Sequence, residues 1–471
     1  MAPPLTVRNL TSVPISLKLI ERYNAPKGDI VHQASKLAGN ITSFTNNFTD
    51  LVGVKLPTGP RNQTLPDNAQ SFAHEEVDIR IDPFTTNHTD KHATERSNDE
   101  VLRLTFEAEG QRYRIDVPLP VRYTRELTPL VQDPRHHFTA VFVPSETFLS
   151  IISSANLNEW MREMADRTPI SALSIPGTHN SPTCHPAPPS VRCQAVSPRE
   201  QLENGVRFFD IRVQPESETE VNDKLILVHS VFPISLTGNK YFRDLERDVI
   251  NFLDEHRSET VVFSLKREGP GHATDQHLSK IIRDHYGNSD RWWTEPHWPK
   301  LGEARGKIVL LRRYALDDSV KNEHDGRGYG IEAENWADKA VNDHHGAVIV
   351  QDFYEVLDTE NIDLKIKYAT EHLERAGCCV CPDDEQAPPP PMYLNFLSAS
   401  NFWKVGCWPE KIAAKLNPAI VNHLAIKHIM AENGDWGTGV VICDWVGDSG
   451  DWDIVRCIVA MNSKLMMRQR R

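Results

Sequence analysis

The stretch "VRFFDIRV", residues 206–213, is largely apolar, and two charged side chains, Asp210 and Arg212, lie near its end. Its β-branched and aromatic residues favour a β-strand, and a run with little alternation is typical of a strand that is buried on both faces. Such burial occurs where helices cover both sides of a parallel sheet. The stretch therefore predicts an α/β fold in which a strand end carries charged side chains.

Similar apolar runs recur from residue 168 onward, and segments with helical periodicity separate them. One separating segment begins with the capping box Ser197-Pro198-Arg199-Glu200 and ends at Gly205, and another repeats apolar residues at helical spacing from Phe242 to Leu253. Eight strand–helix repeats predict a (β/α)8 TIM-type barrel over residues 155–471. The eight runs are ISALSIPG (from 170), VRFFDIRV (206), LILVHS (225), TVVFSLKRE (260), KIVLLRRY (307), AVIVQDFYEV (347), MYLNFLSAS (392) and VVICDWVG (440).

The first 145 residues have a different pattern, in which apolar and polar residues alternate. "VLRLTFEAEGQRYRIDVPLP", residues 101–120, alternates in two halves that meet at Glu109-Gly110, which predicts a β-hairpin with one buried face. Two similar short runs, "VDIRIDPF" and "FTAVFVP", add further strands. Residues 1–145 therefore predict a small antiparallel β-sandwich whose role the sequence does not indicate.

Composition excludes several classes of partner. The 471 residues carry a net charge of −13, which argues against binding to nucleic acid and against broad attraction to anionic lipid surfaces. No stretch approaches the roughly 18 consecutive apolar residues of a membrane span, and the start "MAPPLTVRNLTSVPIS" lacks the pattern of a signal peptide. We therefore expect a cytoplasmic protein with at most transient peripheral contact with membranes.

The eight cysteines form no regular framework. "CCVCP", residues 378–382, offers thiols, but the second C-x-x-C or nearby histidine pair of a zinc site is missing. Cys184 and Cys193 flank a proline-rich loop, where they could form a disulfide in an oxidising setting or remain free thiols.

Polar residues stand at the ends of seven of the eight predicted strands. Each of them alone is typical of a loop residue or a structural ion pair, but active sites of such barrels lie where the strands end, so their coincidence favours a site. In strand order they are His179 after the first strand, Asp210 and Arg212 at the second, His229 at the third, Lys266 at the fourth, Arg313 at the fifth, Asp352 and Tyr354 at the sixth and Asp444 at the eighth.

The residue types in this set suit one reaction. Two imidazoles with pKa values near neutrality can act as base and acid on opposite sides of a phosphodiester. An arginine between them stabilises the charge that develops on the phosphate oxygens. The set therefore predicts intramolecular phosphoryl transfer.

The motifs "IPGTHNS" (175–181), "VRFFDIRV", "LVHS" (227–230) and "GKIVLLRRY" (306–314), in this order, resemble the X domain of bacterial-type phosphatidylinositol-specific phospholipase C. "IVQDFYEV" (349–356), "LNFLSAS" (394–400) and "VVICDWV" (440–446) resemble the same family, so the similarity spans about residues 160 to 460. The resemblance implies a distorted barrel that cleaves phosphatidylinositol, or a glycosylated derivative, into diacylglycerol and a cyclic inositol phosphate.

The resemblance also implies a role for each residue. His179 would be the general base for the inositol 2-hydroxyl and Asp444 would orient it, while Arg212 would bind the non-bridging phosphate oxygens. His229, paired with Asp210, would protonate the departing diacylglycerol oxygen. The inositol hydroxyls and ring would be bound by Lys266, Arg313, Asp352 and Tyr354.

Two positions bear on metal dependence. Arg212 places a fixed cation where calcium-dependent members of the superfamily hold their metal, so we expect no metal or other cofactor, and calcium is disfavoured by charge repulsion. Asn180 departs from the bacterial pattern, which commonly has Asp after the base histidine. Asparagine can accept a hydrogen bond, and we place it among the substrate-binding residues, but it cannot neutralise Arg212.

Alternative functions remain open from the sequence. The chain could be a binding module that recognises inositol-lipid headgroups without turnover, or a metal-dependent phosphodiesterase of the same superfamily on another lipid. Loss of cleavage in His179→Ala or His229→Ala and insensitivity to chelator discriminate between them. Two aromatic groups could contact a bilayer or simply pack the barrel: Trp292, Trp293 and Trp298, or Phe402, Trp403 and Trp408.

Overall fold

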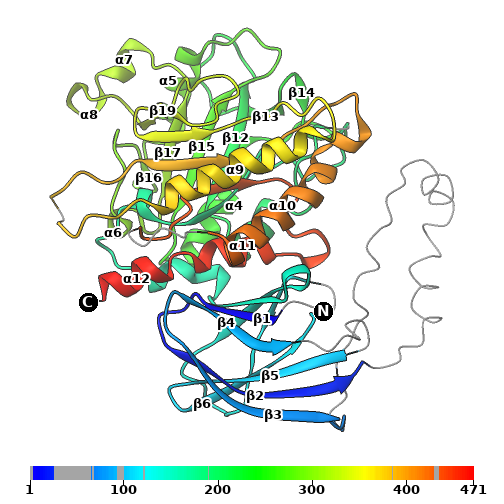
Figure 1. The fold of residues 1–471 in the computed structure, drawn as a ribbon. Helices are drawn as coiled ribbons and strands as arrows, with labels where there is room; N and C mark the ends of the chain where they lie inside the picture. The colour runs from blue at the N-terminus through cyan, green and yellow to red at the C-terminus, as the bar shows by residue number, and fades with distance from the viewer. Residues whose placement is uncertain are drawn as a thin grey trace. The chain divides into compact units, whose positions relative to one another are not determined.

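The computed structural model describes residues 4–25, 65, 68–92, 100–119, 122–188, 190–384, 386–428 and 434–470. The chain divides into two units, Met1–Ser154 and Ala155–Arg471 (Figure 1). Each unit has its own hydrophobic core. Among the described residues, no helix is long and apolar enough to cross a membrane.

The first unit is the predicted sandwich, built from two five-stranded sheets. Apolar side chains of both sheets form one core between them. The predicted hairpin is confirmed, since Ala108 pairs with Gln111 across a turn in which Glu109 and Gly110 both have positive φ. One strand pair, β1 with β10, is parallel, which the alternating pattern could not reveal. The sheet orders are β4-β1-β10-β9-β7 and β3-β2-β5-β6-β8, with β1 Pro4–Asn9, β2 Ile15–Asn24, β3 Ala73–Ile81, β4 Thr85–His92, β5 Glu100–Ala108, β6 Gln111–Val117, β7 Thr124–Glu126, β8 Thr128–Pro129, β9 Phe138–Val143 and β10 Phe148–Ser153.

The second unit is a distorted barrel, as predicted, around a curled sheet of order β16-β17-β15-β12-β11-β22-β21-β20-β19. All but one of the eight predicted runs become its parallel strands. The exception is "LILVHS", which pairs antiparallel to β12. The strands are β11 Ile175–Thr178, β12 Phe208–Pro215, β13 Leu225–His229, β14 Phe232–Pro233, β15 Val261–Arg267, β16 Trp292–Trp293, β17 Ile308–Arg313, β18 Ile331–Glu332, β19 Asp343–His345, β20 Val348–Gln351, β21 Met392–Phe396 and β22 Val440–Cys443.

The two-residue strand β18 was missed from sequence because it is too short to show a pattern. It pairs parallel to β17 through Leu311 with Ile331. In the described part of the chain, no strand pairing joins β18 to β19 or β20, so the barrel stays open there.

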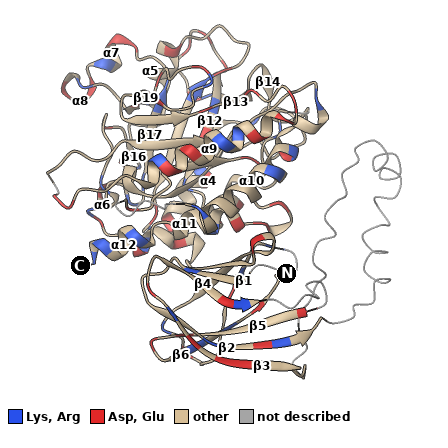
Figure 2. Ribbon diagram, viewed as in Figure 1, with Lys and Arg blue, Asp and Glu red and all other residues tan. Residues whose placement is uncertain are grey.

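Helices cover the outside of the barrel sheet. The predicted cap is confirmed at α3, where the Ser197 hydroxyl accepts a hydrogen bond from the Glu200 N–H. Acidic and basic residues are interspersed on the ribbons of α9 and α10 (Figure 2). The helices are α3 Pro198–Glu203, α4 Phe242–Glu255, α5 Asp275–His285, α6 Leu301–Ala304, α7 Asp318–Lys321, α8 Glu323–Gly326, α9 Asn361–Gly377, α10 Pro409–Ile426, α11 Asp453–Ala460 and α12 Ser463–Gln469, with 3-10 turns at Pro144–Glu146, Leu157–Glu163, Ile170–Ala172, Val405–Cys407 and Asp448–Gly450.

Candidate active site

A cavity of about 510 Å³ opens where the barrel strands end. Strand register explains why several cations meet there: Arg212 on β12 lies opposite Lys266 on β15, and Lys266 lies opposite Arg313 on β17. Seven of the ten residues predicted for the site line the cavity, namely His179, Arg212, His229, Lys266, Arg313, Asp352 and Tyr354. The other three, Asn180, Asp210 and Asp444, are buried behind its wall, with 1%, 0% and 2% of their surface exposed.

His179 follows β11 directly, and hydrogen bonds hold both its backbone and its ring. Its N–H donates to the Cys443 carbonyl at 2.9 Å, and its ring Nδ1 lies 2.9 Å from the Asp444 carboxylate, which follows the neighbouring strand β22. A carboxylate on Nδ1 fixes the tautomer, so the lone pair of the neutral ring is on Nε2. Nε2 lies 3.1 Å from Nη2 of Arg212. His179 is therefore oriented as a base whose basic nitrogen lies beside the arginine.

The pKa of His179 is set by two opposing effects. Burial lowers the pKa, but Asp444 and, after it, Cys193 outweigh burial and raise the pKa of His179 to about 10. Near pH 7 the ring is therefore mostly protonated in the unliganded site, and only its neutral fraction can take a proton from an alcohol.

His229 ends β13, and its ring lies nearly perpendicular to that of His179, with 5.8 Å between the ring centroids. Its Nδ1 lies 3.0 Å from the Val191 carbonyl, which leaves Nε2 available for proton transfer. Burial, and then the positive charge of Arg212, lower the pKa of His229 to about 3. The pKa values of the two histidines are thus shifted in opposite directions, so that in the unliganded site near pH 7 His179 carries a proton on both ring nitrogens and His229 is neutral.

The predicted pairing of His229 with Asp210 is wrong. The buried carboxylate of Asp210 instead accepts hydrogen bonds from Arg313 at 2.9 Å, from Arg212 at 3.5 Å and from the Asn180 N–H at 3.1 Å. The register of β13 runs back along β12, so the reason is one of partners: Arg313, Arg212 and the Asn180 N–H occupy the Asp210 carboxylate, and Nδ1 of His229 lies against the Val191 carbonyl. Asp210 therefore holds the arginines and the turn after His179, and a backbone carbonyl orients His229.

Glu268 is the residue that the sequence reasoning missed. It follows β15, two residues after Lys266 and so on the same face, and its carboxylate accepts from Nη1 of Arg212 at 3.1 Å. It also accepts from Lys266 at 3.0 Å and from the Ser230 N–H at 2.9 Å. Burial raises the pKa of Glu268, but Arg212 and Lys266 outweigh it and hold the pKa well below its usual range. The sequence does contain a signal that could have identified Glu268: it stands two residues after Lys266, so both side chains lie on the same face of the strand.

Asn180 is buried behind the cavity wall and does not line the cavity. A residue that binds substrate is expected to line it. Asn180 has a positive φ of 41°, which starts the turn after β11, and its Nδ2 lies 3.3 Å from Nε2 of His179. The charge that Asp would supply at this position in the bacterial pattern is supplied to Arg212 by Glu268 and Asp210.

The wall opposite the histidines combines aromatic and polar side chains. The Arg313 guanidinium lies 3.9 Å from the centre of the Trp336 ring, whose N–H donates to Asp352 at 3.1 Å. The Tyr354 hydroxyl donates to Asp338 at 2.6 Å. Trp336 and Asp338 were also missed from sequence, because they lie between β18 and β19, where no apolar run marks the fold.

One group of potential metal ligands borders the cavity. His179, Cys193 and His229 each offer a ligand atom, and these atoms lie within 4.8 Å of one another. Arg212, 3.1 Å from Nε2 of His179, opposes a cation there. Cys193 and Cys184 are free thiols in this structure.

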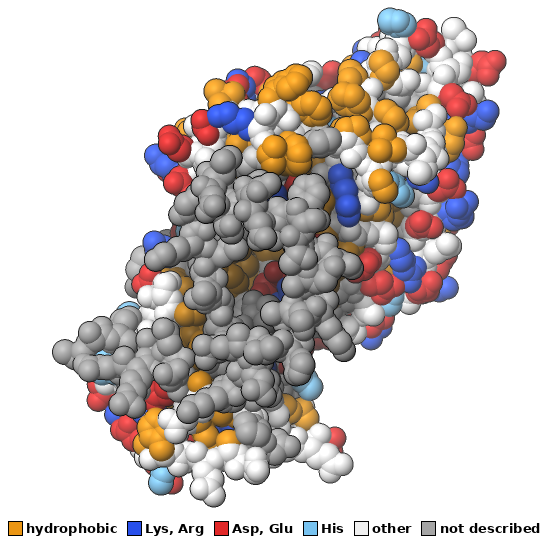
Figure 3. All heavy atoms as spheres, turned by 90° about the vertical axis from the view of Figure 1, so that its right-hand side faces the viewer, with side chains coloured by type: hydrophobic (Ala, Val, Ile, Leu, Met, Phe, Trp, Pro, Cys, Tyr) orange, Lys and Arg blue, Asp and Glu red, His pale blue; other side chains and the backbone are white. Residues whose placement is uncertain are grey.

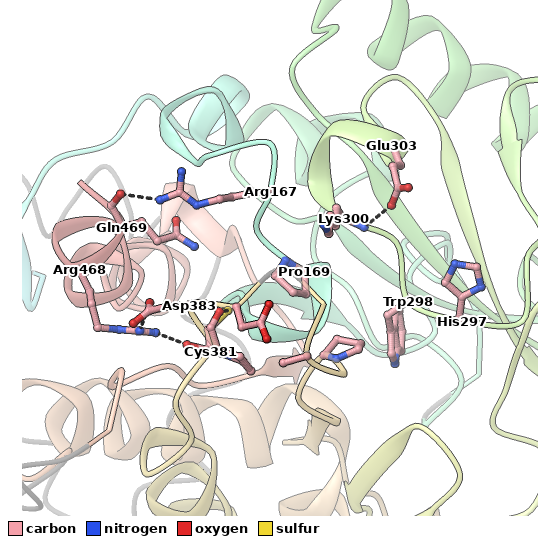
Figure 4. A pocket seen from close by; sticks show the side chains of 14 residues that line it. Arg167, Pro169, His297, Trp298, Lys300, Glu303, Cys381, Asp383, Arg468 and Gln469 are labelled. Carbon is pink, nitrogen blue, oxygen red and sulfur yellow. Dashed lines mark hydrogen bonds and ion pairs between the residues drawn. The ribbon is translucent and has the colours of Figure 1, made fainter. Parts of the chain in front are cut away.

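A larger cavity, of about 750 Å³, is shown in Figure 4. Among its lining residues, Pro169 precedes β11 and Pro389 precedes β21. Its arginines are engaged with the chain itself: Arg167 donates to the Gln469 carbonyl, and Arg468 pairs with Asp383. The histidine pair lines the smaller cavity, so we take the smaller cavity as the candidate active site.

Exposed apolar side chains lie next to the residues that line the active-site cavity. Val231 (58% exposed) follows Ser230, and Trp403 (87%) comes soon after Ser400. Figure 3 shows apolar side chains gathered on the upper part of the barrel unit. Of the two aromatic groups considered from sequence, the first is largely packed, since Trp292 and Trp298 are each 5% exposed. We call the exposed set the apolar rim; it consists of Val231, Phe232, Leu236, Leu357, Phe402, Trp403 and Val405.

A barrel with paired histidines and clustered cations at its strand ends defines a barrel phosphodiesterase. Residues 167–314 match the family "Phosphatidylinositol-specific phospholipase C, X domain". The match spans the part of the barrel unit from before β11 to the residue after β17.

Several known proteins are similar to a larger part of the chain. A protein named 1-phosphatidylinositol phosphodiesterase from Staphylococcus aureus is 27% identical over 333 residues, covering 66% of this chain and 95% of the relative. A protein of the same name from Listeria monocytogenes is 28% identical over 220 residues, covering 44% of this chain and 65% of the relative. A solved structure of the Staphylococcus aureus phosphatidylinositol-specific phospholipase C matches with a TM-score of 0.51 at 25% identity, covering 65% of this chain and 98% of that one.

Proposed function

We propose that this chain is a phosphatidylinositol-specific phospholipase C that cleaves phosphatidylinositol, or a glycosylated derivative, into diacylglycerol and a cyclic inositol phosphate. The observation that carries the proposal is the Asp444–His179 hydrogen bond with His229 across the cavity and Arg212 beside Nε2 of His179. The names of the relatives and the family of residues 167–314 support the same reaction.

In the first half of the step, the inositol 2-hydroxyl attacks phosphorus. Nε2 of His179 takes the hydroxyl proton, and Asp444 stabilises the imidazolium that forms. Arg212 donates to the non-bridging oxygens as their negative charge grows, and Glu268 keeps its guanidinium in place. The new O–P bond closes the cyclic phosphate.

In the second half, the bond between phosphorus and the diacylglycerol oxygen breaks. His229 gives its proton to that oxygen, so diacylglycerol leaves as a neutral alcohol. The pKa of His229 is low beside Arg212, and a phosphodiester anion bound between them raises it again. Substrate binding therefore favours the protonated form of His229, which is the form that acts as the acid.

The opposite wall suits the inositol ring. Its hydroxyls need both donors and acceptors, which Lys266, Arg313 and Asp352 supply, while Tyr354 presents an aromatic face. The apolar rim would contact the bilayer surface transiently and bring the headgroup to the cavity.

The reaction as proposed uses no metal ion. Arg212 and Lys266 supply the positive charge that a divalent cation would otherwise bring to the phosphate. A cytoplasmic location with peripheral membrane contact is part of the same proposal.

The direct test is cleavage of phosphatidylinositol vesicles in the presence of EDTA, followed by phosphorus NMR for the cyclic phosphate. We expect activity in the unaltered chain and a loss of roughly 10²–10⁴-fold in His179→Ala, because general-base catalysis is removed. His297→Ala, which changes a histidine of the larger cavity, is the control and should keep full activity.

Two results would overturn the proposal. Headgroup binding without any cleavage by the unaltered chain would indicate a binding module. Activity that disappears in EDTA and returns with Ca²⁺ or Mg²⁺ would indicate a metal-dependent phosphodiesterase, and a parallel panel of sphingolipid and glycerophosphodiester substrates would then identify its class.

A further inference from the structure

Helices α9 and α10 bring together three side chains that the proposed reaction does not use. Glu374 lies near the end of α9, His423 lies in the last turn of α10, and His428 follows α10 by two residues. The two helices pack against each other along the barrel. Because helices return toward the start of the strands, these residues lie at the opposite end of the barrel from the active-site cavity.

The three side chains converge on one point. The Glu374 carboxylate lies 2.7 Å from Nε2 of His423 and 3.4 Å from Nδ1 of His428, and one ligand atom of each residue lies within 4.8 Å of the other two. Ligand atoms of a tetrahedral zinc site lie roughly 3.3 Å apart, as Zn–N and Zn–O bonds of about 2.0–2.1 Å require. Small side-chain movements would therefore bring all three into one coordination sphere.

The surroundings prepare these groups to bind a cation. Nε2 of His428 lies 3.2 Å from the Trp436 carbonyl, which leaves Nδ1 as the ligand, and such a partner on the second ring nitrogen is typical of metal-binding histidines. The His428 N–H donates to the His423 carbonyl at 2.8 Å, so the backbone fixes the two histidines relative to each other. Two helix C-termini end here, and their partial negative charge favours a cation.

Two other groups of possible metal ligands occur among the described residues, and an arginine lies against each of them. Arg212 lies 3.1 Å from Nε2 of His179, and Arg199 pairs with Glu203 and Glu255. A guanidinium opposes a cation at both places.

We propose that Glu374, His423 and His428 form a structural site for a zinc-class divalent cation that clamps the end of α9 to the end of α10. Water would occupy the fourth position. The site is independent of the proposed catalysis, and its metal would stabilise the barrel rather than take part in the reaction.

The test measures metal bound to the full chain. Protein stripped with EDTA and dialysed is mixed with Zn²⁺, freed of excess metal by gel filtration and analysed for zinc content. We expect Glu374→Gln and His423→Gln each to lose one equivalent relative to the unaltered chain. Glu371→Gln, which removes a carboxylate one helical turn earlier on α9 that pairs with Lys367, is the matched control and should lose none.

A second measurement distinguishes loss of the metal site from a general loss of stability in a variant. Saturating Zn²⁺ should raise the Tm of the unaltered chain and of Glu371→Gln by roughly 3–6 °C, and that increment should vanish in Glu374→Gln whatever its own Tm. Equal zinc content and equal increments in all variants would overturn the proposal. Cleavage of phosphatidylinositol by the stripped protein should be unchanged, so failure of this site leaves the proposed catalysis intact.

Discussion

Asp444 sets the proton affinity of the proposed base, and pH profiles report this influence. Base catalysis needs neutral His179 and gains as pH rises through its pKa of about 10, whereas acid catalysis needs protonated His229 and is lost as pH rises through its pKa of about 3. Between the two pKa values the gain of neutral His179 and the loss of protonated His229 cancel, so kcat/KM is flat there and falls below a pH of about 3 and above a pH of about 10. The alkaline limb is therefore positioned by the pKa of His179.

Asp444→Asn should move this alkaline limb to lower pH. The substitution removes the charge that raises the pKa of His179, and it should also reduce kcat by roughly 10²–10⁴-fold because the tautomer is no longer held. The measurement is kcat/KM against pH for both proteins. An alkaline limb that stays in place would contradict the assigned role of Asp444.

Glu268 is predicted to position Arg212 on the phosphate. Glu268→Gln should lower kcat by roughly 10-fold or more, with a smaller effect on KM, because Arg212 acts most strongly on the charge of the transition state. The informative control is the double variant Asn180→Asp with Glu268→Gln, which returns a carboxylate to the neighbourhood of Arg212. Recovery of part of the lost kcat is expected, and no recovery together with an unfolded Glu268→Gln would point to a purely structural role.

Single residues were predictable where a strand end and a motif coincided, as at His179, Arg212 and Asp444. Glu268 and Trp336 were not, because their importance lies in contacts with Arg212 and Arg313 that no local pattern reveals. The error at Asp210 has the same origin. Asp210 comes before Arg212, His229 and Arg313 in the chain. The sequence does not show which of these side chains its carboxylate contacts.

At the scale of elements, β13 and the loops beside the cavity depart most from a regular barrel. Seven apolar runs were predicted correctly as parallel strands because burial on both faces leaves a strong pattern. "LILVHS" has the same apolar pattern but pairs antiparallel to β12, since an apolar run does not encode its direction. That departure carries His229 to the Val191 carbonyl.

The loop between β21 and α10 should determine binding to vesicles. Trp403→Ala removes the most exposed member of the apolar rim and should weaken binding to phosphatidylinositol vesicles roughly 10-fold, the amount expected from loss of one large buried side chain. Cleavage of a soluble inositol phosphodiester should not change. Val380→Ala, at an exposed apolar residue after α9, is the control, and an equal loss in both variants would contradict a specific role of the rim.

At the scale of the whole molecule, two units with separate cores lie in one chain, and the sequence shows the change of pattern between them near residue 150. Alternation predicts the sandwich and near-continuous apolar runs predict the barrel, because each pattern reflects how many faces of a strand are buried. The opening between β18 and β20 was not predictable, since the missing strand pairing leaves no mark in composition.

In the proposed reaction His179 takes a proton and His229 gives one, and a change of leaving group tests these two roles most directly. Diacylglycerol needs a proton to leave, whereas a nitrophenolate from an aryl ester of inositol phosphate does not. The rates of His179→Ala and His229→Ala should therefore be compared on both substrates. We predict that His229→Ala loses roughly 10²–10⁴-fold on phosphatidylinositol and less than about 10-fold on the aryl ester, while His179→Ala is impaired on both. An equal loss on both substrates in His229→Ala would contradict its role as the acid.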